Sequence, residues 1–356
     1  MGVRMRNKGF LLLENETIYE GEFFGAAGDV TGEIVFTTGM TGYVETLTDP
    51  SYYGQIVLQT FPLIGNYGVI PPDFESGIIG PRAYIVKYPC REPSNYRSEG
   101  NLDAFLAERG VIGLCGIDTR ALTRMIRQNG VMNGSILRNA PTVRDLETVR
   151  QYRIRDAVQA VSRRSAVKTG DGSWRVALLD LGAKQGMTDA LLHRDCTVLT
   201  FPYDASAEEI LKAEPDGILL SNGPGDPSDS ANRTIVEQIR ILQRQNIPIL
   251  GICLGHQLLA LANGFGTRKL KFGHRGANQP VRDVVTGRVY ITSQNHGYEV
   301  VADDSAFVNV NDGSCEGLEY GQSFSVQFHP EARGGPLDTT FLFDRFVERM
   351  EMYATR

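Results

Sequence analysis

Cys253 is the residue of this chain whose surroundings best suit a nucleophile. Residues 251–255 read Gly-Ile-Cys-Leu-Gly, after an apolar run and before a stretch with helical periodicity. A sharp turn from a buried strand into a helix strains the backbone at its centre and lifts that side chain above the sheet. The flanking glycines allow close approach of neighbouring backbone, and the start of a helix favours a thiolate. A free cysteine is usually only a small buried apolar residue, but this pattern favours a nucleophile.

His329 is the candidate base for this nucleophile. A thiol needs a base to take up its proton and an acid to release a leaving amine. His329 follows a β-like run at 325–328, and Glu331 stands two residues further on, close enough to orient the imidazole. Alone, the histidine could be a packed residue and the glutamate a solvated loop carboxylate. Together with Cys253 they predict a Cys-His-Glu triad assembled from separate strand ends.

A glycine-rich loop at 221–227, Ser-Asn-Gly-Pro-Gly-Asp-Pro, follows the apolar run DGILL. Such a loop exposes backbone N–H groups, which can stabilise a tetrahedral oxyanion together with the N–H of Leu254. A plain surface turn is the alternative for this composition. The chain has no G-x-x-x-x-G-K-[ST] motif, so it carries no Walker-type ATP site.

Short apolar runs alternate with helical segments from Trp174 onward. The runs lack the polar alternation of half-exposed strands and are typical of strands buried on both faces. They lie at 175–181, 196–201, 216–221 and 247–252, with a helical segment at 233–244 between the last two. This order predicts a doubly wound, mostly parallel sheet, whose sites form at the carboxyl ends of the strands. The candidate residues fall at those ends.

The first part of the chain has a different pattern. Strands are expected at 32–36 and 55–60, and helices at 102–108 and 120–128, the second after the cap Asp118-Thr119. We interpret residues 1–150 as a mixed β/α docking domain, the polar stretch 151–173 as a connector, and residues 174–356 as the second domain. The fold class expected is therefore α/β.

Composition limits the possible partners and the compartment. The chain has 356 residues, enough for two domains, with 42% apolar and 22% charged residues. Its net charge of −6 gives no electrostatic reason to expect nucleic acid or an anionic membrane as partner. The five cysteines are scattered singly, so neither a metal site nor a disulfide framework is expected. Without a signal peptide core or a run of ~20 apolar residues, we expect a soluble, cytoplasmic protein.

Four ordered motifs, SNGPGDP, GICLGHQLLA, QNHGY and FHPEA, resemble the class I (triad) glutamine amidotransferase domain, from Trp174 to about Met350. The resemblance implies that Cys253 attacks the side-chain amide of glutamine and forms a glutamyl thioester, with His329 and Glu331 completing the triad. It implies oxyanion support at Gly223 and Leu254. Positions that match glutamine-holding residues of the family are Gly225, Gln257, Asn295, Gly297 and Tyr298. At the last of these the family often carries Phe.

The N-terminal part resembles the carbamoyl-phosphate synthase small-subunit family, so that the resemblance covers almost the whole chain. The motifs are MTGY at 40–43, LTDPSY at 47–52, IGNYG at 64–68 and IDTR at 117–120. Ser51 matches a family position that reaches the glutamine site, although its surroundings alone indicate only a turn.

This resemblance implies a reaction shared between two subunits. The chain would hydrolyse glutamine to glutamate and ammonia, and a large subunit would use ATP to make carbamoyl phosphate from that ammonia and bicarbonate, for pyrimidine and/or arginine synthesis. No cofactor is expected in this chain, whereas ATP and magnesium are expected in the large partner subunit.

Three other interpretations remain. An amidotransferase could serve another synthase, such as one making anthranilate or GMP, but the N-terminal motifs argue against it. A cysteine peptidase or γ-glutamyl hydrolase could use the same triad alone, yet it has no need of about 150 further residues. A non-catalytic interaction subunit would not require the intact set of Cys253, His329 and Glu331.

Overall fold

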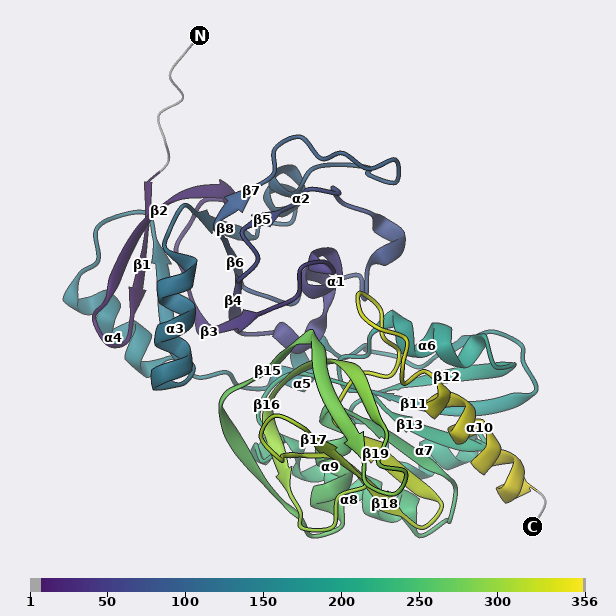
Figure 1. Cartoon of the computed structure of the whole chain (residues 1–356). Coiled ribbons are helices and arrows are strands. Elements are labelled where there is room, and N and C mark those ends of the chain that lie inside the picture. The colour runs from purple at the N-terminus through teal and green to yellow at the C-terminus, as the bar shows by residue number, and fades with distance from the viewer. Residues whose placement is uncertain (1–7, 355–356) are drawn as a thin grey trace. The chain divides into compact units, whose positions relative to one another are not determined.

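The computed structural model describes residues 8–354, which form two compact units divided between Arg155 and Asp156 (Figure 1). The first unit is a closed barrel with the strand order β1-β2-β8-β6-β4-β3-β9. Its strands are β1 (Lys8–Leu13), β2 (Ile18–Gly25), β3 (Val30–Thr37), β4 (Gln55–Gln59), β6 (Ala83–Val86), β8 (Ile112–Cys115) and β9 (Met132–Leu137). The pairs β3–β4, β4–β6 and β6–β8 are parallel, and the others are antiparallel.

The helices of the first unit connect these strands. They are α1 (Tyr43–Thr48), α2 (Leu102–Glu108), α3 (Thr119–Asn129) and α4 (Val143–Gln151), with short 3₁₀ turns η1 (Pro50–Tyr52) and η2 (Pro71–Asp73). A small two-stranded sheet joins β5 (Leu63–Ile64) and β7 (Tyr88–Pro89). The expected strands at 32–36 and 55–60 and both expected helices are present. The predicted cap is confirmed, since the Asp118 carboxylate accepts the N–H of Ala121 at 2.9 Å.

The second unit is a ten-stranded sheet with the order β10-β12-β11-β13-β14-β19-β18-β16-β15-β17. The strands are β10 (Val167–Thr169), β11 (Trp174–Asp180), β12 (Cys196–Pro202), β13 (Gly217–Leu220), β14 (Ile249–Ile252), β15 (Gly266–Asp283), β16 (Val289–Val301), β17 (Phe307–Asn309), β18 (Cys315–Tyr320) and β19 (Ser323–Val326). The five strands from β12 to β19 are parallel, as the alternating pattern predicts. The remaining strands pair antiparallel.

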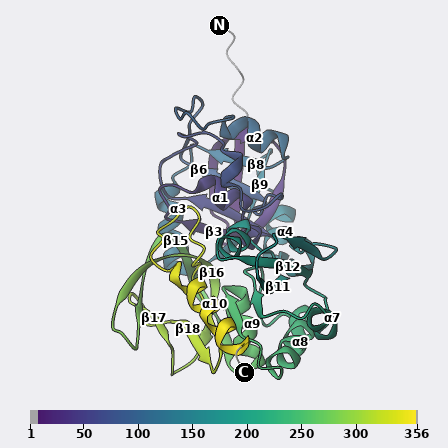
Figure 2. The ribbon, with the colours of Figure 1, turned by 90° about the vertical axis from the view of Figure 1, so that its right-hand side faces the viewer.

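Helices cover both faces of this sheet. On one face α6 (Gln185–Leu192) and α10 (Phe341–Ala354) pack on a cluster that includes Val176 and Leu178. On the other, α7 (Ala207–Lys212), α8 (Arg233–Gln243) and α9 (Leu254–Ala262) pack on a cluster that includes Ala177 and Leu179 (Figure 2). Successive residues of β11 thus enter opposite cores, which confirms a strand buried on both faces.

The segment 151–173, expected as a connector, differs from that expectation. It contains α5 (Ala157–Val161) and β10, and β10 pairs antiparallel with β12, with Lys168 opposite Leu199. β10 is the edge strand of the sheet, so it has a neighbouring strand on one side only, and the polar side chains of Lys168 and Thr169 fit such a position. Most of this segment therefore belongs to the second unit. Within residues 8–354, no helix has both the length and the apolar character needed to cross a bilayer.

Candidate active site

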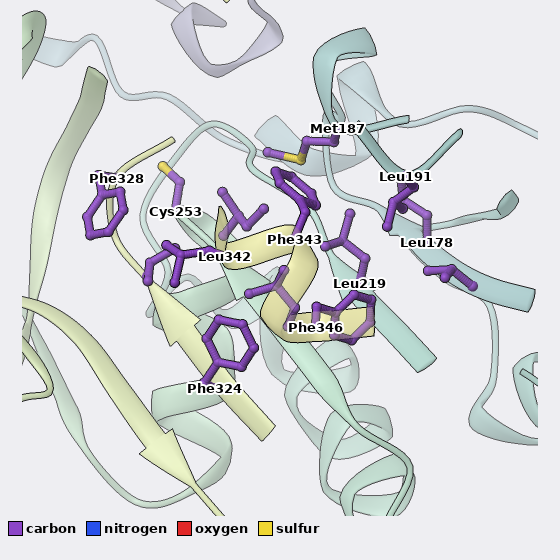
Figure 3. Packing of buried hydrophobic residues seen from close by; sticks show 14 of the residues in the cluster. Leu178, Met187, Leu191, Leu219, Cys253, Phe324, Phe328, Leu342, Phe343 and Phe346 are labelled. Carbon is purple, nitrogen blue, oxygen red and sulfur yellow. The ribbon is translucent and has the colours of Figure 1, made fainter. Parts of the chain in front are cut away.

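Cys253 lies at the turn between β14 and α9, with φ 55° and ψ −105°. A residue other than glycine seldom adopts such a positive φ, and its presence here marks a strained turn of the kind expected at a nucleophile elbow. The backbone N–H of Cys253 donates to the carbonyl of Val326 at 2.9 Å, which anchors the turn to β19. Figure 3 shows the Sγ at the edge of the apolar cluster, directed away from Phe343 and Phe346.

The glycines on either side of Cys253 are required by close backbone contacts. A Cβ on Gly255 would lie 2.2 Å from the carbonyl oxygen of Leu220, and a Cβ on Gly251 would lie 2.7 Å from the carbonyl oxygen of Gly255. Neither distance is compatible with a side chain. Glycine is therefore needed at both positions because neighbouring backbone approaches closely, as the sequence indicated.

His329 is placed beside Cys253 by the pairing of two parallel strands. Ile252, the last residue of β14, stands opposite Val326, the last residue of β19, so the segments that follow both strands emerge at the same edge. His329 is 2% exposed. Its Nε2 has no hydrogen-bond partner of ordinary geometry among residues 8–354, and the Cys253 side chain acts on the imidazole to raise its pKa.

Glu331 binds the ring nitrogen of His329 that faces away from Cys253. Its Oε1 lies 2.6 Å from His329 Nδ1, and the same oxygen accepts from Lys184 Nζ at 2.9 Å. Burial alone would lower the pKa of His329, but the charges of Glu331 and Cys253 outweigh burial and the opposing Lys184 and raise it to about 10. Burial would raise the pKa of Glu331, but Lys184 and His329 hold it well below its usual range. The carboxylate is therefore ionised.

Gly223 and Leu254, the expected oxyanion positions, lie close together. Gly223 follows β13, and a Cβ added there would lie 2.8 Å from Leu254 Cδ2 and 2.2 Å from the carbonyl oxygen of Leu181. Leu254 is the first residue of α9, and N–H groups in the first turn of a helix have no partner within that helix. The loop and the helix start thus converge near Cys253, as an oxyanion site needs.

The segment Asn295–Tyr298 of β16 also reaches this region. Cys253 Sγ lies 3.6 Å from the carbonyl oxygen of Asn295, and Gln257 Nε2 donates to the carbonyl of Tyr298 at 2.9 Å. Opposite Gly297, β15 has a bulge between Lys269 and His274. The structure therefore brings Gln257, Asn295, Gly297 and Tyr298 to the nucleophile helix.

The two other residues expected to bind glutamine, Gly225 and Ser51, lie in other segments of the chain. Gly225, in the loop after β13, has a φ of 95°, which suits glycine. Ser51 lies in η1 of the first unit, where its N–H donates to Asp49 Oδ1 at 2.9 Å. The role of Ser51 stays a prediction.

Among the described residues, His274, His296 and Glu316 could hold a metal ion, with ligand atoms within 4.8 Å of one another. His274 Nε2, however, lies 2.8 Å from Asp312 Oδ2, and its Nδ1 lies 3.5 Å from Glu316 Oε1. Burial lowers the pKa of His274, but these two carboxylates raise it to about 9, so its imidazolium already supplies a positive charge between them. Both ring nitrogens of His296 also have hydrogen-bond partners. The cluster is thus held together as an ion-pair network, in which His274 Nδ1 and Glu316 Oε2 have no hydrogen-bond partner among residues 8–354.

Two buried residues of the site were missed by the sequence analysis. Lys184, 7% exposed, follows the carboxyl end of β11, the edge at which sites form in such sheets, and that position was the available signal. Gln327, 0% exposed, accepts from Gln257 Nε2 at 2.9 Å. Nothing in its sequence surroundings distinguishes it from a packed strand residue.

Comparison with known proteins agrees with both halves of this description. Residues 11–136 match the family model "Carbamoyl-phosphate synthase small chain, CPSase domain", and residues 177–349 match "Glutamine amidotransferase class-I". The carbamoyl phosphate synthase small chain of Clostridium perfringens is 48% identical over 348 residues, covering 96% of this chain and 99% of that protein. That of Bacillus caldolyticus is 48% identical over 350 residues, covering 95% of each chain.

A match of this extent includes the N-terminal unit, which argues against an amidotransferase of another synthase and against a stand-alone hydrolase. The chain therefore belongs to the carbamoyl phosphate synthase small-chain family, as its glutamine-hydrolysing subunit with a class I glutamine amidotransferase domain.

Proposed function

We propose that Cys253, His329 and Glu331 form the catalytic triad that releases ammonia from glutamine. The observation that carries this proposal is the strained Cys253 turn beside an imidazole whose Nδ1 lies 2.6 Å from a buried carboxylate. The Cys253 sulfur attacks the side-chain amide carbon, and the proton of His329 goes to the amide nitrogen as the carbon–nitrogen bond breaks. Ammonia leaves, and a glutamyl thioester remains on the sulfur.

The second half of the reaction reverses the roles of the groups. His329, now neutral, takes a proton from water, whose oxygen attacks the thioester carbonyl. The carbon–sulfur bond breaks, glutamate leaves, and the imidazolium faces the sulfur again. The raised pKa of His329 supports this cycle, because a protonated imidazole is ready at neutral pH for the departing amine.

The surrounding backbone and side chains have separate tasks. The N–H groups of Gly223 and Leu254 stabilise the oxyanion of both tetrahedral intermediates. The glutamine itself is held by Ser51, Gly225, Gln257, Asn295, Gly297 and Tyr298. Support for Gln257, Asn295 and Tyr298 comes from the contacts of Asn295 with Cys253 and of Gln257 with Tyr298. Gly297 lies between Asn295 and Tyr298, opposite the bulge of β15.

The ammonia passes to a large ATP-using subunit, which joins it to bicarbonate and forms carbamoyl phosphate for pyrimidine and/or arginine synthesis. ATP and magnesium act in that partner, and no cofactor acts in this chain. The support for the partner is the name of the relatives, each a small chain of carbamoyl phosphate synthase.

The test compares two nitrogen sources in a complex of this chain with the large subunit. Cys253→Ser should abolish glutamine-dependent synthesis and leave ammonia-dependent synthesis nearly intact, because a hydroxyl is a much poorer nucleophile here while the fold barely changes. If a folded complex loses both activities, Cys253 does not act in the ammonia-generating step.

A further inference from the structure

Gln327 makes a contact that bears on how glutamine is recognised. We infer that Gln327 is a positioning residue, which turns the Gln257 amide so that its oxygen faces the ligand. The inference rests on the proposed function, in which Gln257 holds the glutamine. Gln257 lies one helical turn after Cys253 and is 3% exposed, while Gln327 is 0% exposed.

The orientation of the Gln257 amide follows from its two acceptors. One is the backbone carbonyl of Tyr298, at 2.9 Å, which can only accept, so the NH₂ group of the amide must point there. The second N–H of the same group then needs an acceptor, and Gln327 Oε1 provides it at 2.9 Å. Both donors of the Gln257 amide are used within the protein, which leaves its Oε1 as the group that can accept from a ligand.

The backbone of Gln327 is anchored, while its side-chain Nε2 has no hydrogen-bond partner among residues 8–354. Its backbone N–H donates to the carbonyl of Glu316 at 2.9 Å, which ties it to the neighbouring strand β18. It stands two residues before His329, and both side chains meet α9, His329 at Cys253 and Gln327 at Gln257, one turn further along. The segment that carries the base therefore also supports the residue that holds the substrate.

An amide oxygen left to accept from a ligand favours a cationic donor. The cation that glutamine offers is its α-ammonium group, which is remote from the amide that is cleaved. Gln257 Oε1 would accept from this ammonium, and Gln327 would keep the oxygen in that orientation. Without Gln327, one buried N–H of Gln257 lacks an acceptor, and the carbonyl of Tyr298 alone holds the amide, so its oxygen is kept less firmly toward the ammonium.

Gln327→Met tests this arrangement, because methionine has nearly the same shape and lacks the amide oxygen. In the full-length chain we expect KM for glutamine to rise about tenfold with kcat changed less than about threefold, as for one weakened hydrogen bond to the substrate. Gln327→Glu retains an acceptor for Gln257 and should stay closer to the unchanged chain. Carbamoylbutanoate, which is glutamine without its α-amino group, should show no difference between the unchanged chain and Gln327→Met, as a substrate or as a competing inhibitor.

A double substitution separates positioning from a general loss of structure. If Gln327 acts through Gln257, adding Gln327→Met to Gln257→Ala should change KM little further. A fall in kcat at unchanged KM, or an equal loss with carbamoylbutanoate, would overturn the inference. If Gln327→Met does not fold, Gln327→Leu, which also lacks the amide oxygen, decides between the same outcomes when it is measured with both compounds. Failure of the unchanged chain to hydrolyse glutamine at all would instead overturn the proposed function.

Discussion

Lys184 Nζ lies 2.9 Å from Glu331 Oε1, the same carboxylate oxygen that faces the imidazole of His329. The side chains of Lys184 and Glu331 are 8% and 0% exposed, so water screens this pair little. Lys184 therefore has two opposite effects. It keeps Glu331 ionised, and it lowers the pKa of His329, which Glu331 and Cys253 raise.

Removing this cation should change the pH dependence of the glutamine reaction. In Lys184→Met, the pKa of His329 should rise further, because the opposing charge is gone and Glu331 remains. Deacylation needs a neutral imidazole, so we expect glutaminase activity at pH 7.5 to fall about tenfold and to recover partly at higher pH. Lys212→Met, which removes an exposed pair with Glu208, is the matched control and should change nothing measurable. An unchanged pH profile in Lys184→Met would contradict this role.

The triad residues should differ in how much activity each one contributes. His329→Asn should lower the glutamine reaction by about 10³-fold or more, since thioester formation loses its proton acceptor and amine departure its donor. Glu331→Gln should be milder, because an amide can still accept from the imidazole and orient it. Steady-state rates of the two variants give the comparison. Greater damage from Glu331→Gln would show that orientation by Glu331 matters more than proton transfer by His329.

Cysteine labelling offers a test that needs no turnover. A glutamine-like alkylating agent should modify Cys253 first, and glutamine should protect it. Burial raises the pKa of Cys115 and of Cys196 to about 11 and raises that of Cys315, so these thiols are seldom ionised at neutral pH. Peptide mass spectrometry with and without glutamine measures the selectivity. Equal labelling of Cys253 and Cys90, equally blocked by glutamine, would speak against Cys253 as the nucleophile.

The sequence predicted the parts of the second unit that depend on local pattern. The runs at 175–181 and 247–252 are strands because apolar residues without alternation fit a strand covered on both faces. Cys253 directly follows the second of these strands, so its place at a strand end could be predicted from the same apolar run. The short edge strand β10 was missed, because it has only three residues, Val167–Thr169, of which two are polar and two are exposed.

Contacts between distant parts of the chain could not be predicted in this way. Lys184 and Glu331 are 147 positions apart, and no local pattern shows that a lysine after β11 will meet a glutamate after β19. The ion pairs of His274 have the same origin, with partners 38 and more positions away. Closure of the barrel in the first unit likewise depends on β1 and β9 pairing across more than 100 residues of intervening chain.

His274 should make the stability of the second unit depend on pH. Its pKa is raised to about 9, against an ordinary 6.5, because Asp312 and Glu316 outweigh burial. The folded state thus holds this proton more tightly than the unfolded state. The stabilisation is complete below about pH 6.5 and is lost as the pH rises through about 9. The unfolding free energy of the unchanged chain relative to His274→Gln should fall by about 3 kcal/mol between pH 6 and pH 9.5. Urea unfolding at both pH values measures it, and a constant difference would contradict a protonated His274.

The partner should control the rate at which this chain uses glutamine. Hydrolysis without a consumer wastes both glutamine and ammonia, so an active site that responds to the state of the large subunit is expected. The first unit holds its own barrel and buried core, and none of the triad residues lies in it. It is therefore the part of the chain free to serve as a docking surface, where an interface of standard size would bury about 1,600 Å².

The measurement is the glutaminase rate of the chain alone, then of its complex with the large subunit, and then of that complex with ATP and bicarbonate. We expect a slow rate alone and acceleration of about tenfold or more in the last case, since a coupling free energy of 1–3 kcal/mol corresponds to a factor of about 5 to 150. Ammonia should appear in carbamoyl phosphate rather than in bulk solvent, because ammonia released to water is protonated and no longer attacks. Adding ATP to a complex with Cys253→Ser controls for ammonia from other sources. A full rate from the chain alone, unchanged by the partner, would defeat the coupled reaction and favour a hydrolase that acts by itself.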